Sequence, residues 1–384
     1  MTENTHPDSS HLPVLKVLGL GGGGSNAVNR MIELGLQGVE FIVANTDMQA
    51  LNSSLAPIKI PLGPNLTRGL GAGGDPGIGA KAAEESHDAL FHALDGADMV
   101  FLTAGMGGGT GTGAISIAGE IAQSVGATTI AIVTMPFSFE MGKRQTNASE
   151  GLQLLRPNTD TLIAIPNDRL LSIAPKDLPL EVAFRLADDV LRQAVQGIAE
   201  LVIEPGLVNV DFAHVRRMMK LGGGALMAIG QGEGSHKAID AIDQALNHPL
   251  MESVSLPDAA GIIANFSGGK ALTLFEVREA LEYIHSLAEK EIDVVMGYSS
   301  DNRLSDRAQV ILVITGLGAP SLEEVLPGAE RLSSPPDIEA QPEPLPDVTH
   351  NVPIMAASPP AKSSAVEDLD IPAFMRRHQR YTPA

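Results

Sequence analysis

Residues 107–113 are GGGTGTG, and this glycine-rich stretch joins two segments of opposite character. The apolar run Met99–Thr103 before it is typical of a buried strand, whereas Ile115–Val125 after it has the apolar spacing of a helix. Five glycines among seven residues allow successive backbone N–H groups to face one concavity, and Thr110 and Thr112 add two hydroxyl groups. The stretch therefore predicts a loop that binds an anion such as phosphate.

Two further glycine-rich loops lie close to it in the sequence. The segment Gly19–Gly24 fits G-x-G-x-x-G and separates the apolar run Val14–Leu20 from the helical pattern of Asn26–Leu34. Glycine lets backbone N–H groups approach phosphate oxygens, and the first turn of a helix adds positive potential. The third loop is Gly69–Asp75. Because loops at the ends of neighbouring strands can hold a triphosphate from two sides, the three together predict a nucleotide site.

Strand and helix patterns alternate along the first half of the chain. Further strands are expected at Val39–Ala44, Thr129–Thr134 and Thr161–Ile165, and a helix is expected at Ala80–Leu94. This alternation indicates an α/β fold with a parallel sheet that is covered by helices on both faces.

A long helix and a second α/β region follow. Leu180–Ile203 keeps apolar residues at core spacing along its whole length, which predicts a central connecting helix. Beyond it, strands are expected at Gly261–Phe266, Ile292–Gly297 and Val310–Thr315, with a helix at Thr273–Leu287.

The composition changes from Ala319 onward. Ten prolines, together with Glu, Ser and Ala, occur between Pro320 and Pro360, and this composition is typical of a disordered linker. The segment Asp368–Arg377 regains apolar and basic residues, which favours a tethered docking peptide over an unremarkable frayed tail.

Composition also limits the compartment and the partners. The chain has no cysteine, which excludes disulfides and thiolate metal sites and fits a reducing compartment. Met1–Pro13 lacks the features of a signal peptide, and no apolar run reaches the ~18 residues of a membrane span. The net charge of −20 repels nucleic acid and acidic membrane surfaces and makes self-association depend on cations or strong local contacts, unless the acidity serves only solubility. We expect a soluble cytoplasmic protein that binds no nucleic acid and does not insert directly into the membrane.

Other classes of site fit the sequence less well. Gly19–Gly24 alone also fits an NAD-dependent dehydrogenase, in which Asp47 at the end of the next strand would hold a ribose. A Walker loop is absent, since Ala264 and Ala271 stand where its first glycine and its Ser/Thr would lie around Lys270. The sequence contains no HExxH, no G-x-S-x-G and no clustered histidines, so we expect no metal site built by the protein alone.

The chain resembles the FtsZ family, the bacterial homologues of tubulin, from about Val14 to Gly318. The most specific motif is Gly107–Gly113, which is similar to the tubulin-type signature loop. Further motifs occur in the order of the family: Gly21–Asn26, Asn45-Thr46-Asp47, Gly69–Pro76, Pro136–Glu140 with Arg144, and Ile165–Arg169. The segment Asp368–Arg377 resembles the C-terminal peptide of the family.

The resemblance implies a tubulin-like architecture. A Rossmann-like GTP-binding domain is expected over 14–179, a central helix over 180–205 and a second α/β domain, which activates the GTPase, over 206–318. A disordered N-terminus is expected over 1–13, a disordered linker over 319–365 and a docking peptide over 366–384.

The resemblance also implies which residues surround GTP and Mg²⁺. Contacts in and around the phosphate loops are expected from Gly22, Gly23, Gly24, Ser25, Asn26, Asn45, Ala72, Gly73, Gly108, Gly109, Thr110, Gly111 and Thr112. Glu140, Arg144 and Asn167 are expected to contact the ribose and its surroundings, and Mg²⁺ is expected chiefly on the phosphates.

Two residues of the long helix suit a guanine base. Phe184 and Asp188 are four residues apart, so they share one face of the helix. A carboxylate can accept hydrogen bonds from both N1–H and N2–H₂ of guanine, whereas N1 of adenine is an acceptor that would repel it.

Catalysis in this family requires a second subunit, whose acidic loop positions the attacking water. That loop resembles Asn209–His214, but the family has acids at its third and sixth positions, whereas this chain has Asp211 and His214. Beside a triphosphate and Asp211 the charged imidazole is favoured, so it would pair with phosphate and slow hydrolysis. Asp75, where Asn is commoner in the family, adds a negative charge near the phosphates.

Three hypotheses follow from the sequence. The first is a GTP-dependent filament protein of the cell-division ring, in which subunits assemble head to tail and GTP hydrolysis is completed between them. The second is a non-hydrolysing filament or scaffold protein of the same family, and the third is an NAD-dependent dehydrogenase. The resemblance further implies a position at the division site on the inner face of the membrane, with FtsA- or SepF-like membrane tethers bound to the tail.

Overall fold

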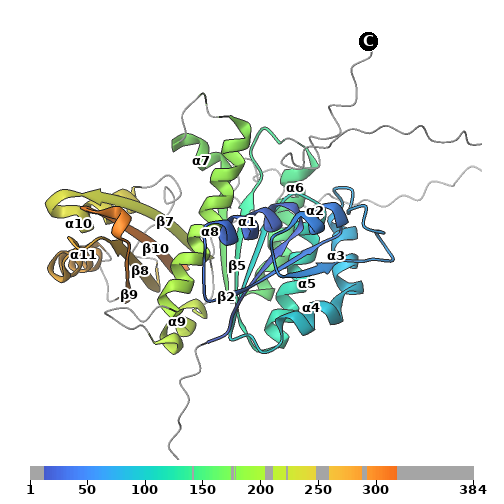
Figure 1. Ribbon diagram of the computed structural model, residues 1–384, viewed down its shortest axis with the longest axis horizontal. Coiled ribbons are helices and arrows are strands. Elements are labelled where there is room, and N and C mark those ends of the chain that lie inside the picture. The colour runs from blue at the N-terminus through green and yellow to red at the C-terminus, as the bar shows by residue number, and fades with distance from the viewer. Residues whose placement is uncertain are drawn as a thin grey trace, which may run out of the picture. The chain divides into compact units, whose positions relative to one another are not determined.

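Ten strands form one sheet in the computed structural model, which describes residues 13–140, 142–173, 177, 179–203, 211–221, 224–247, 259–287 and 292–317 (Figure 1). The strand order is β3-β2-β1-β4-β5-β6-β7-β10-β8-β9. Apart from Pro13, the predicted N-terminal segment, the linker and the docking peptide lie outside the described residues.

The first six strands in the chain run parallel to one another. They are β1 (Leu15–Leu20), β2 (Val39–Asn45), β3 (Ile58–Pro61), β4 (Met99–Gly105), β5 (Thr128–Met135) and β6 (Thr161–Pro166). In the register of the sheet, Leu15 lies beside both Val39 and Met99. Both β1 and β5 are buried at every position, as expected for parallel strands with helices on both faces.

Helices connect these strands and cover the sheet. They are α1 (Gly21–Glu33), α2 (Met48–Ser53), α3 (Pro76–Glu85), α4 (His87–Leu94), α5 (Thr110–Ser124), α6 (Lys143–Leu155) and α7 (Asn167–Ile173). Phe101 of β4 packs in one apolar core with Val28 and Met31 of α1. Successive strand residues point to opposite faces, so Val100 and Leu102 face the other side, where α5 contacts β4 and β5.

The helix α8 (Leu180–Ile203) lies between the two halves of the sheet (Figure 1). Its apolar face belongs to the same core as β1, β4 and β5, with Leu191, Val195 and Ile198 at most 1% exposed. The opposite half of the sheet also reaches this helix, because Asn265 Nδ2 donates to Gly197 O at 3.2 Å.

The second half of the sheet is mixed. It contains β7 (Gly224–Glu233), β8 (Gly261–Gly268), β9 (Asp293–Ser300) and β10 (Arg307–Leu317), with the helices α9 (Phe212–Met219), α10 (Lys237–Leu246) and α11 (Leu274–Leu287). The strand β10 is antiparallel to both β7 and β8, whereas β8 and β9 are parallel. Only two residue pairs, Leu162–Gly224 and Ile163–Ala225, join β6 to β7 within the described residues.

The α/β fold class expected from the sequence is confirmed, and α8 has the predicted bounds. Three helix predictions are wrong in detail. The helix expected at Ile115–Val125 begins at Thr110 and ends at Ser124. Ala80–Leu94 is two helices, because Ser86 leaves the helical path and its side-chain oxygen bonds to Pro61 O and Gly63 N. The first helix begins at Gly21 rather than Asn26, so the glycine run Gly21–Gly24 is its first turn.

Close contact between α3 and α5 depends on a glycine. A β-carbon on Gly113 would overlap the Pro76 carbonyl oxygen and lie 2.6 Å from Ala80 N. Backbone atoms cannot move aside as the end of a flexible side chain can, so α5 would have to shift away from α3.

Gly113→Ala is therefore expected to lower the free energy of unfolding by about 1–3 kcal/mol, the usual cost of overpacking. Urea denaturation would measure this change, with Glu120→Ala on the exposed side of the same helix as the control. A Gly113→Ala variant as stable as the control would show that α5 does not need this close approach.

Candidate functional site

The three glycine-rich loops meet at the carboxyl ends of the parallel strands β1, β2 and β4. Gly71 N donates to Thr46 O at 3.0 Å, and the hydroxyl oxygens of Thr46 and Thr110 are 2.6 Å apart. A β-carbon on Gly109 would lie only 2.8 Å from Asp75 N, so the loops Gly107–Gly113 and Gly69–Asp75 are in direct contact. The carboxyl edge of a parallel sheet is the usual place for a ligand in such folds.

The helix N-termini at this edge differ in whether a side chain caps them, and the uncapped ones can bind an anion. Asp47 caps α2 by accepting from Gln49 N and Ala50 N, and Asp75 caps α3 by accepting from Gly77 N. By contrast, no side chain caps α1 or α5. The first-turn N–H groups of α1 and α5 can therefore bind phosphate oxygens, with the helix dipoles adding attraction.

The predicted glycines divide into two groups. Gly22, Gly73 and Gly108 face open space, since no atom would lie within 4 Å of a β-carbon on any of them. Gly24 and Gly111 instead pack against backbone, with Thr103 O and Leu20 O as neighbours, and Gly23 would place a β-carbon 3.0 Å from Gly105 N. The first group leaves room for phosphates, and the second holds the loops together.

Several predicted polar residues bond within the loops. The Ser25 hydroxyl donates to Gly21 O at 2.7 Å, and Thr112 Oγ1 accepts from Gly107 N at 2.8 Å. Asn45 Oδ1 accepts from Asp47 N at 3.2 Å. These side chains shape the cradle, whereas Asn26 is exposed and Ala72 is buried beside Gly109.

The predicted sugar side of the site contains an ion pair. Glu140 and Arg144 are paired, and Glu140 Oε1 also accepts from Phe137 N at 2.9 Å. Asp168 accepts from Ser138 N, which holds the same loop to the start of α7. Asn167 is buried, and its Oδ1 has no hydrogen-bond partner among the described residues. An unpaired buried amide oxygen can accept from a ligand hydroxyl group.

The predicted base side is aromatic and acidic. The ring of the fully buried Phe137 meets Phe184 edge-on, with centroids 5.4 Å apart, and stacks on Phe139 at 5.0 Å. Asp188 lies one turn further along α8, and burial raises its pKa to about 7, although the Arg30 guanidinium acts in the opposite direction. Burial disfavours the ionised carboxylate as long as nothing donates a hydrogen bond to it. A ligand with two adjacent donors, such as guanine, would stabilise the ionised form.

Asn147 is a residue of this site that the sequence did not reveal. Its Nδ2 donates to Gly74 O at 3.2 Å and to Gly107 O at 3.4 Å, so it ties two phosphate loops together from α6. The sequence contained one indication of this role. Asn147 lies three residues after Arg144 on the same helix, so the two residues share one face.

The predicted catalytic residues lie at the opposite edge of the sheet. Asp211 caps α9 by accepting from Ala213 N at 2.9 Å. At the other end of α9, Met219 O accepts from the hydroxyl of Thr161, the first residue of β6. Within one chain Asp211 and His214 are therefore not brought to the phosphate loops, and Asn209 lies outside the described residues.

The described residues contain no group of three or more His, Asp or Glu side chains placed to hold a metal ion. None of the described helices is long and apolar enough to cross a membrane.

Two family models match the chain. Residues 14–175 match the model of the Tubulin/FtsZ family, GTPase domain. Residues 223–318 match that of the FtsZ family, C-terminal domain. These matches correspond to the parallel and the mixed half of the sheet.

Similar solved structures include two of FtsZ from M. jannaschii. An empty dimer is 42% identical, with a TM-score of 0.75 over 79% of this chain and 88% of that chain. A point mutant is 43% identical, with a TM-score of 0.76 over 79% of this chain and 91% of that chain. A CetZ protein of Haloferax volcanii, as a GTPγS-bound protofilament, is 20% identical with a TM-score of 0.67 over 84% and 100% of the two chains, which shows the shared fold alone.

Asp188 predicts how guanine-nucleotide binding depends on pH. The free protein holds Asp188 protonated below its pKa of about 7, whereas guanine requires the carboxylate, so affinity is expected to fall about tenfold per pH unit below that value. Titration of GTP between about pH 5.5 and pH 8 would measure this.

Asp188→Asn is the matched control, because an asparagine side chain cannot ionise. Any pH dependence of its GTP affinity comes from protonation of the phosphates. Its GTP affinity is expected to be low and its preference over ATP reduced. If wild type and Asp188→Asn show the same pH dependence and the same preference for GTP over ATP, Asp188 does not read the base.

Proposed function

The chain belongs to the tubulin/FtsZ family, and on this basis we propose that it is a GTPase of the cell-division ring whose GTP is hydrolysed between two subunits. The observation that supports the coupling most is the separation of the two candidate sites. The phosphate loops follow the carboxyl ends of the strands, and Asp211 lies at the opposite edge.

The length of α8 explains why one chain cannot complete the reaction. Its 24 residues span about 36 Å at 1.5 Å per residue, from the Phe184 end to the end that leads toward α9. A head-to-tail contact between copies places the α9 end of one subunit on the phosphate loops of the next. Such a contact uses two different surfaces and therefore repeats along a filament.

In this proposal each subunit supplies a different part of the chemistry. The N–H groups of the glycine loops and of the α1 and α5 termini bind the phosphates and stabilise charge that develops on them. Asp211 of the next subunit orients the attacking water. Mg²⁺ would bind through the phosphates of GTP and neutralise part of their charge.

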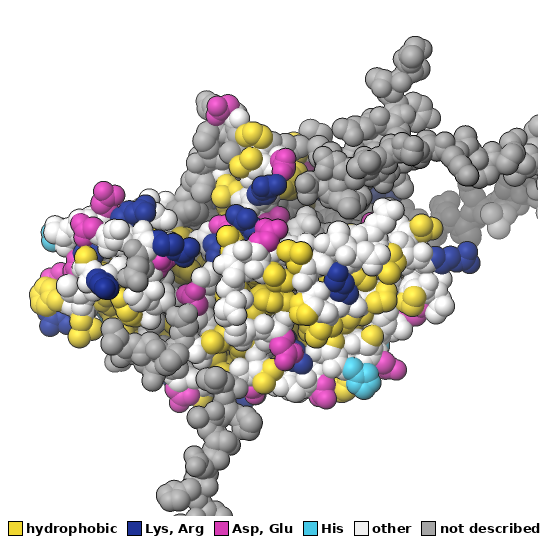
Figure 2. All heavy atoms as spheres, in the orientation of Figure 1, with side chains coloured by type: hydrophobic (Ala, Val, Ile, Leu, Met, Phe, Trp, Pro, Cys, Tyr) yellow, Lys and Arg dark blue, Asp and Glu magenta, His cyan; other side chains and the backbone are white. Residues whose placement is uncertain are grey.

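The surface at the phosphate loops fits a contact between subunits. Leu70 is 85% exposed, and Leu66 and Met48 beside it are also exposed. On the face shown in Figure 2, hydrophobic side chains gather over the half of the molecule that carries α1 to α5. Apolar contacts of this kind, with cations in the medium, would offset the repulsion from a net charge of −20.

The finer parts of this proposal rest on the family resemblance. They include a cytoplasmic location at the division site, the domain limits predicted above, and FtsA- or SepF-like tethers bound to the segment Asp368–Arg377, which lies outside the described residues. The dehydrogenase hypothesis loses its support, because the Asp47 carboxylate caps α2. A non-hydrolysing filament protein stays the second candidate, because His214 replaces an acid in the interface loop.

Mixing two inactive variants tests hydrolysis between subunits. Asp188→Ala is expected to lose GTP binding, and Asp211→Asn is expected to bind GTP but not hydrolyse it, because Asn still caps α9 without the negative charge. In a mixture, Asp188→Ala subunits supply an intact Asp211 to GTP bound on Asp211→Asn subunits.

The measurement is phosphate release with GTP and Mg²⁺ against protein concentration, together with light scattering. Wild type should show cooperative release, and the mixture should release phosphate that neither variant releases alone. Wild-type release that is simply proportional to concentration, with no recovery in the mixture, would place the whole reaction within one subunit.

The identity of residue 214 is expected to control the rate. An acid at this position restores the pattern of the family and removes an imidazole that can pair with phosphate, so His214→Asp should speed GTP turnover and filament disassembly. Turnover per assembled subunit at about pH 6 to pH 8 would show this. An unchanged rate at every pH would mean that Asp211 alone suffices.

A further inference from the structure

A cluster of three charged or polar side chains links α9 to the first residue of β9. His214 Nε2 lies 3.0 Å from Asp293 Oδ2 and 3.2 Å from Oδ1. Arg217 Nη2 lies 3.1 Å from the same Oδ2. His214 and Arg217 are three residues apart on α9, so both face the carboxylate from one side of the helix.

We propose that Asp293 supplies the second carboxylate of the catalytic interface and acts through His214, which is the proton acceptor for water that attacks the GTP of the next subunit. This inference rests on the proposed function. It assigns a positioning role to a residue of β9, which is far in sequence from the interface loop and from the glycine-rich loops.

The charge state of Asp293 determines how the ring is held. Hydrogen bonding from His214, and then the charges of His214 and Arg217, hold the pKa of Asp293 below its usual value despite partial burial. An ionised carboxylate only accepts hydrogen bonds, so Nε2 must carry the proton. In the neutral ring Nδ1 then carries the lone pair and is the free proton-accepting atom.

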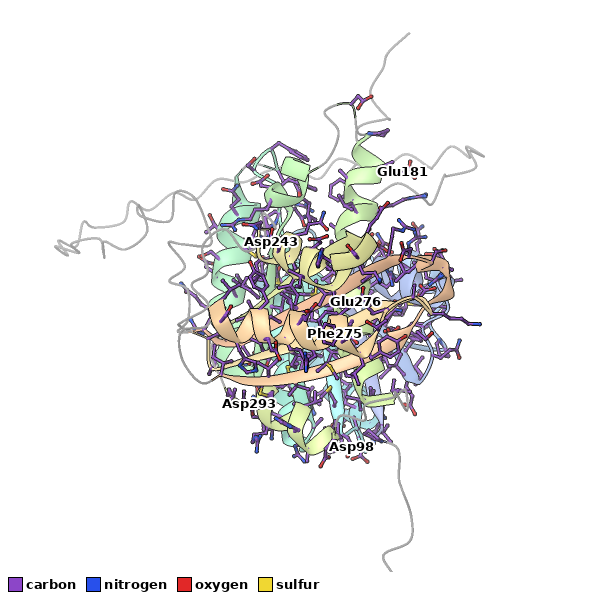
Figure 3. All side chains as sticks on the ribbon, turned by 90° about the vertical axis from the view of Figure 1, so that its left-hand side faces the viewer. Asp98, Glu181, Asp243, Phe275, Glu276 and Asp293 are labelled. Atoms are coloured by element: carbon purple, nitrogen blue, oxygen red, sulfur yellow. The ribbon has the colours of Figure 1, made fainter. Side chains whose placement is uncertain are left out.

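The exposure of the cluster permits contact with a neighbouring subunit. The side chain of His214 is 35% exposed and that of Asp293 is 42% exposed. Figure 3 shows Asp293 at the edge of the sheet and Glu181, near the start of α8, at the opposite end of the molecule. The cluster therefore lies on the Asp211 side and not beside the phosphate loops of its own chain.

Three other carboxylates near this edge accept hydrogen bonds from backbone N–H groups. The Asp211 carboxylate accepts from Ala213 N, Asp98 accepts from Val14 N, and Asp160 accepts from Thr129 N. Arg216 of α9 and Lys220, which follows the last residue of this helix, are exposed. Among the described residues, Asp293 is thus the carboxylate that bonds to the His214 ring.

The proposed step balances in atoms and protons. The water oxygen bonds to the γ-phosphorus while the bond from the γ-phosphorus to the bridging oxygen breaks, and its electron pair stays on GDP. The proton of the water passes to Nδ1 and then to solvent, and Asp293 remains ionised throughout.

A merely structural role for Asp293 would have a different consequence. Exposed ion pairs contribute little to stability. If Asp293 only held α9 to β9, replacing it would change turnover by the same factor whichever residue occupies position 214. A positioning role matters only while a histidine is there to be positioned. The two roles can therefore be separated by changing both positions.

The experiment measures GTP turnover per assembled subunit, GTP affinity and light scattering for full-length wild type, Asp293→Asn, His214→Asp and the double variant. Asn at 293 keeps the shape but can donate to Nε2, which favours the tautomer without a lone pair on Nδ1. Asp301→Asn is the matched control, because Asp301 follows the other end of β9 and is also paired with an arginine.

Asp293→Asn is expected to lower turnover about tenfold or more, since a positioned acid–base group contributes roughly 10²–10⁴-fold. Affinity and scattering should stay unchanged, Asp301→Asn should behave as wild type, and in the His214→Asp background Asp293→Asn should have no effect. Equal losses in both backgrounds, or no loss in either, would overturn the role of Asp293. Turnover by His214→Asp but not by wild type would also overturn it and would support the non-hydrolysing candidate, whereas no phosphate release from any variant would overturn the proposed function itself.

Discussion

The packing of α8 between the two halves of the sheet is the constraint on which the rest of the structure depends. A β-carbon on Gly197 would lie 2.8 Å from Ile311 Cδ1, and one on Gly297 would overlap Leu201. These two glycines let α8 and the second half of the sheet approach closely while its other side packs on β1, β4 and β5. Protein interiors are packed as densely as organic crystals. Dense packing on both sides of α8 therefore fixes the positions of its two ends relative to each other.

This helix connects the two candidate sites physically. Its early turns carry Phe184 and Asp188 beside the predicted base, and its other end leads toward α9, which begins beside Asp211. Because all strands of the first half run in one direction, their carboxyl ends form one edge and their amino ends the other. In the proposed reaction, a nucleotide at one edge and Asp211 at the other therefore require a second subunit.

The nucleotide side also contains groups that are poorly satisfied in the free protein. An acid whose pKa is raised on folding stabilises the fold only while it is protonated, and Asp188 loses this contribution as the pH rises from its unfolded value toward about 7. The buried Asn167 Oδ1, which has no hydrogen-bond partner among the described residues, also lowers the stability of the folded protein. A guanine nucleotide that satisfies both groups binds the folded state alone and so stabilises it.

Local sequence determined much of the fold and of the phosphate cradle. Glycine loops between strand and helix patterns predict the cradle because the required backbone freedom belongs to the residue itself, as at Gly21 with φ of 67°. The bounds of α8 follow from an unbroken apolar period. The strand β7 was not predicted, because Gly230 and Gly232 interrupt its apolar pattern. Both glycines are needed where α10 packs closely on β7, and this is a tertiary contact.

Only the tertiary structure decided which distant side chains meet. Asn147 joins two loops that lie 73 and 40 residues away, and Asp293 meets His214 across 79 residues. Neither contact has a local period or motif, because hydrogen bonds between elements depend on how the helices and strands are packed and not on the spacing along either one. The sequence by itself determined the cradle and the family resemblance, and the packing of α9 beside β9 decided that the histidine of the interface loop has a carboxylate partner.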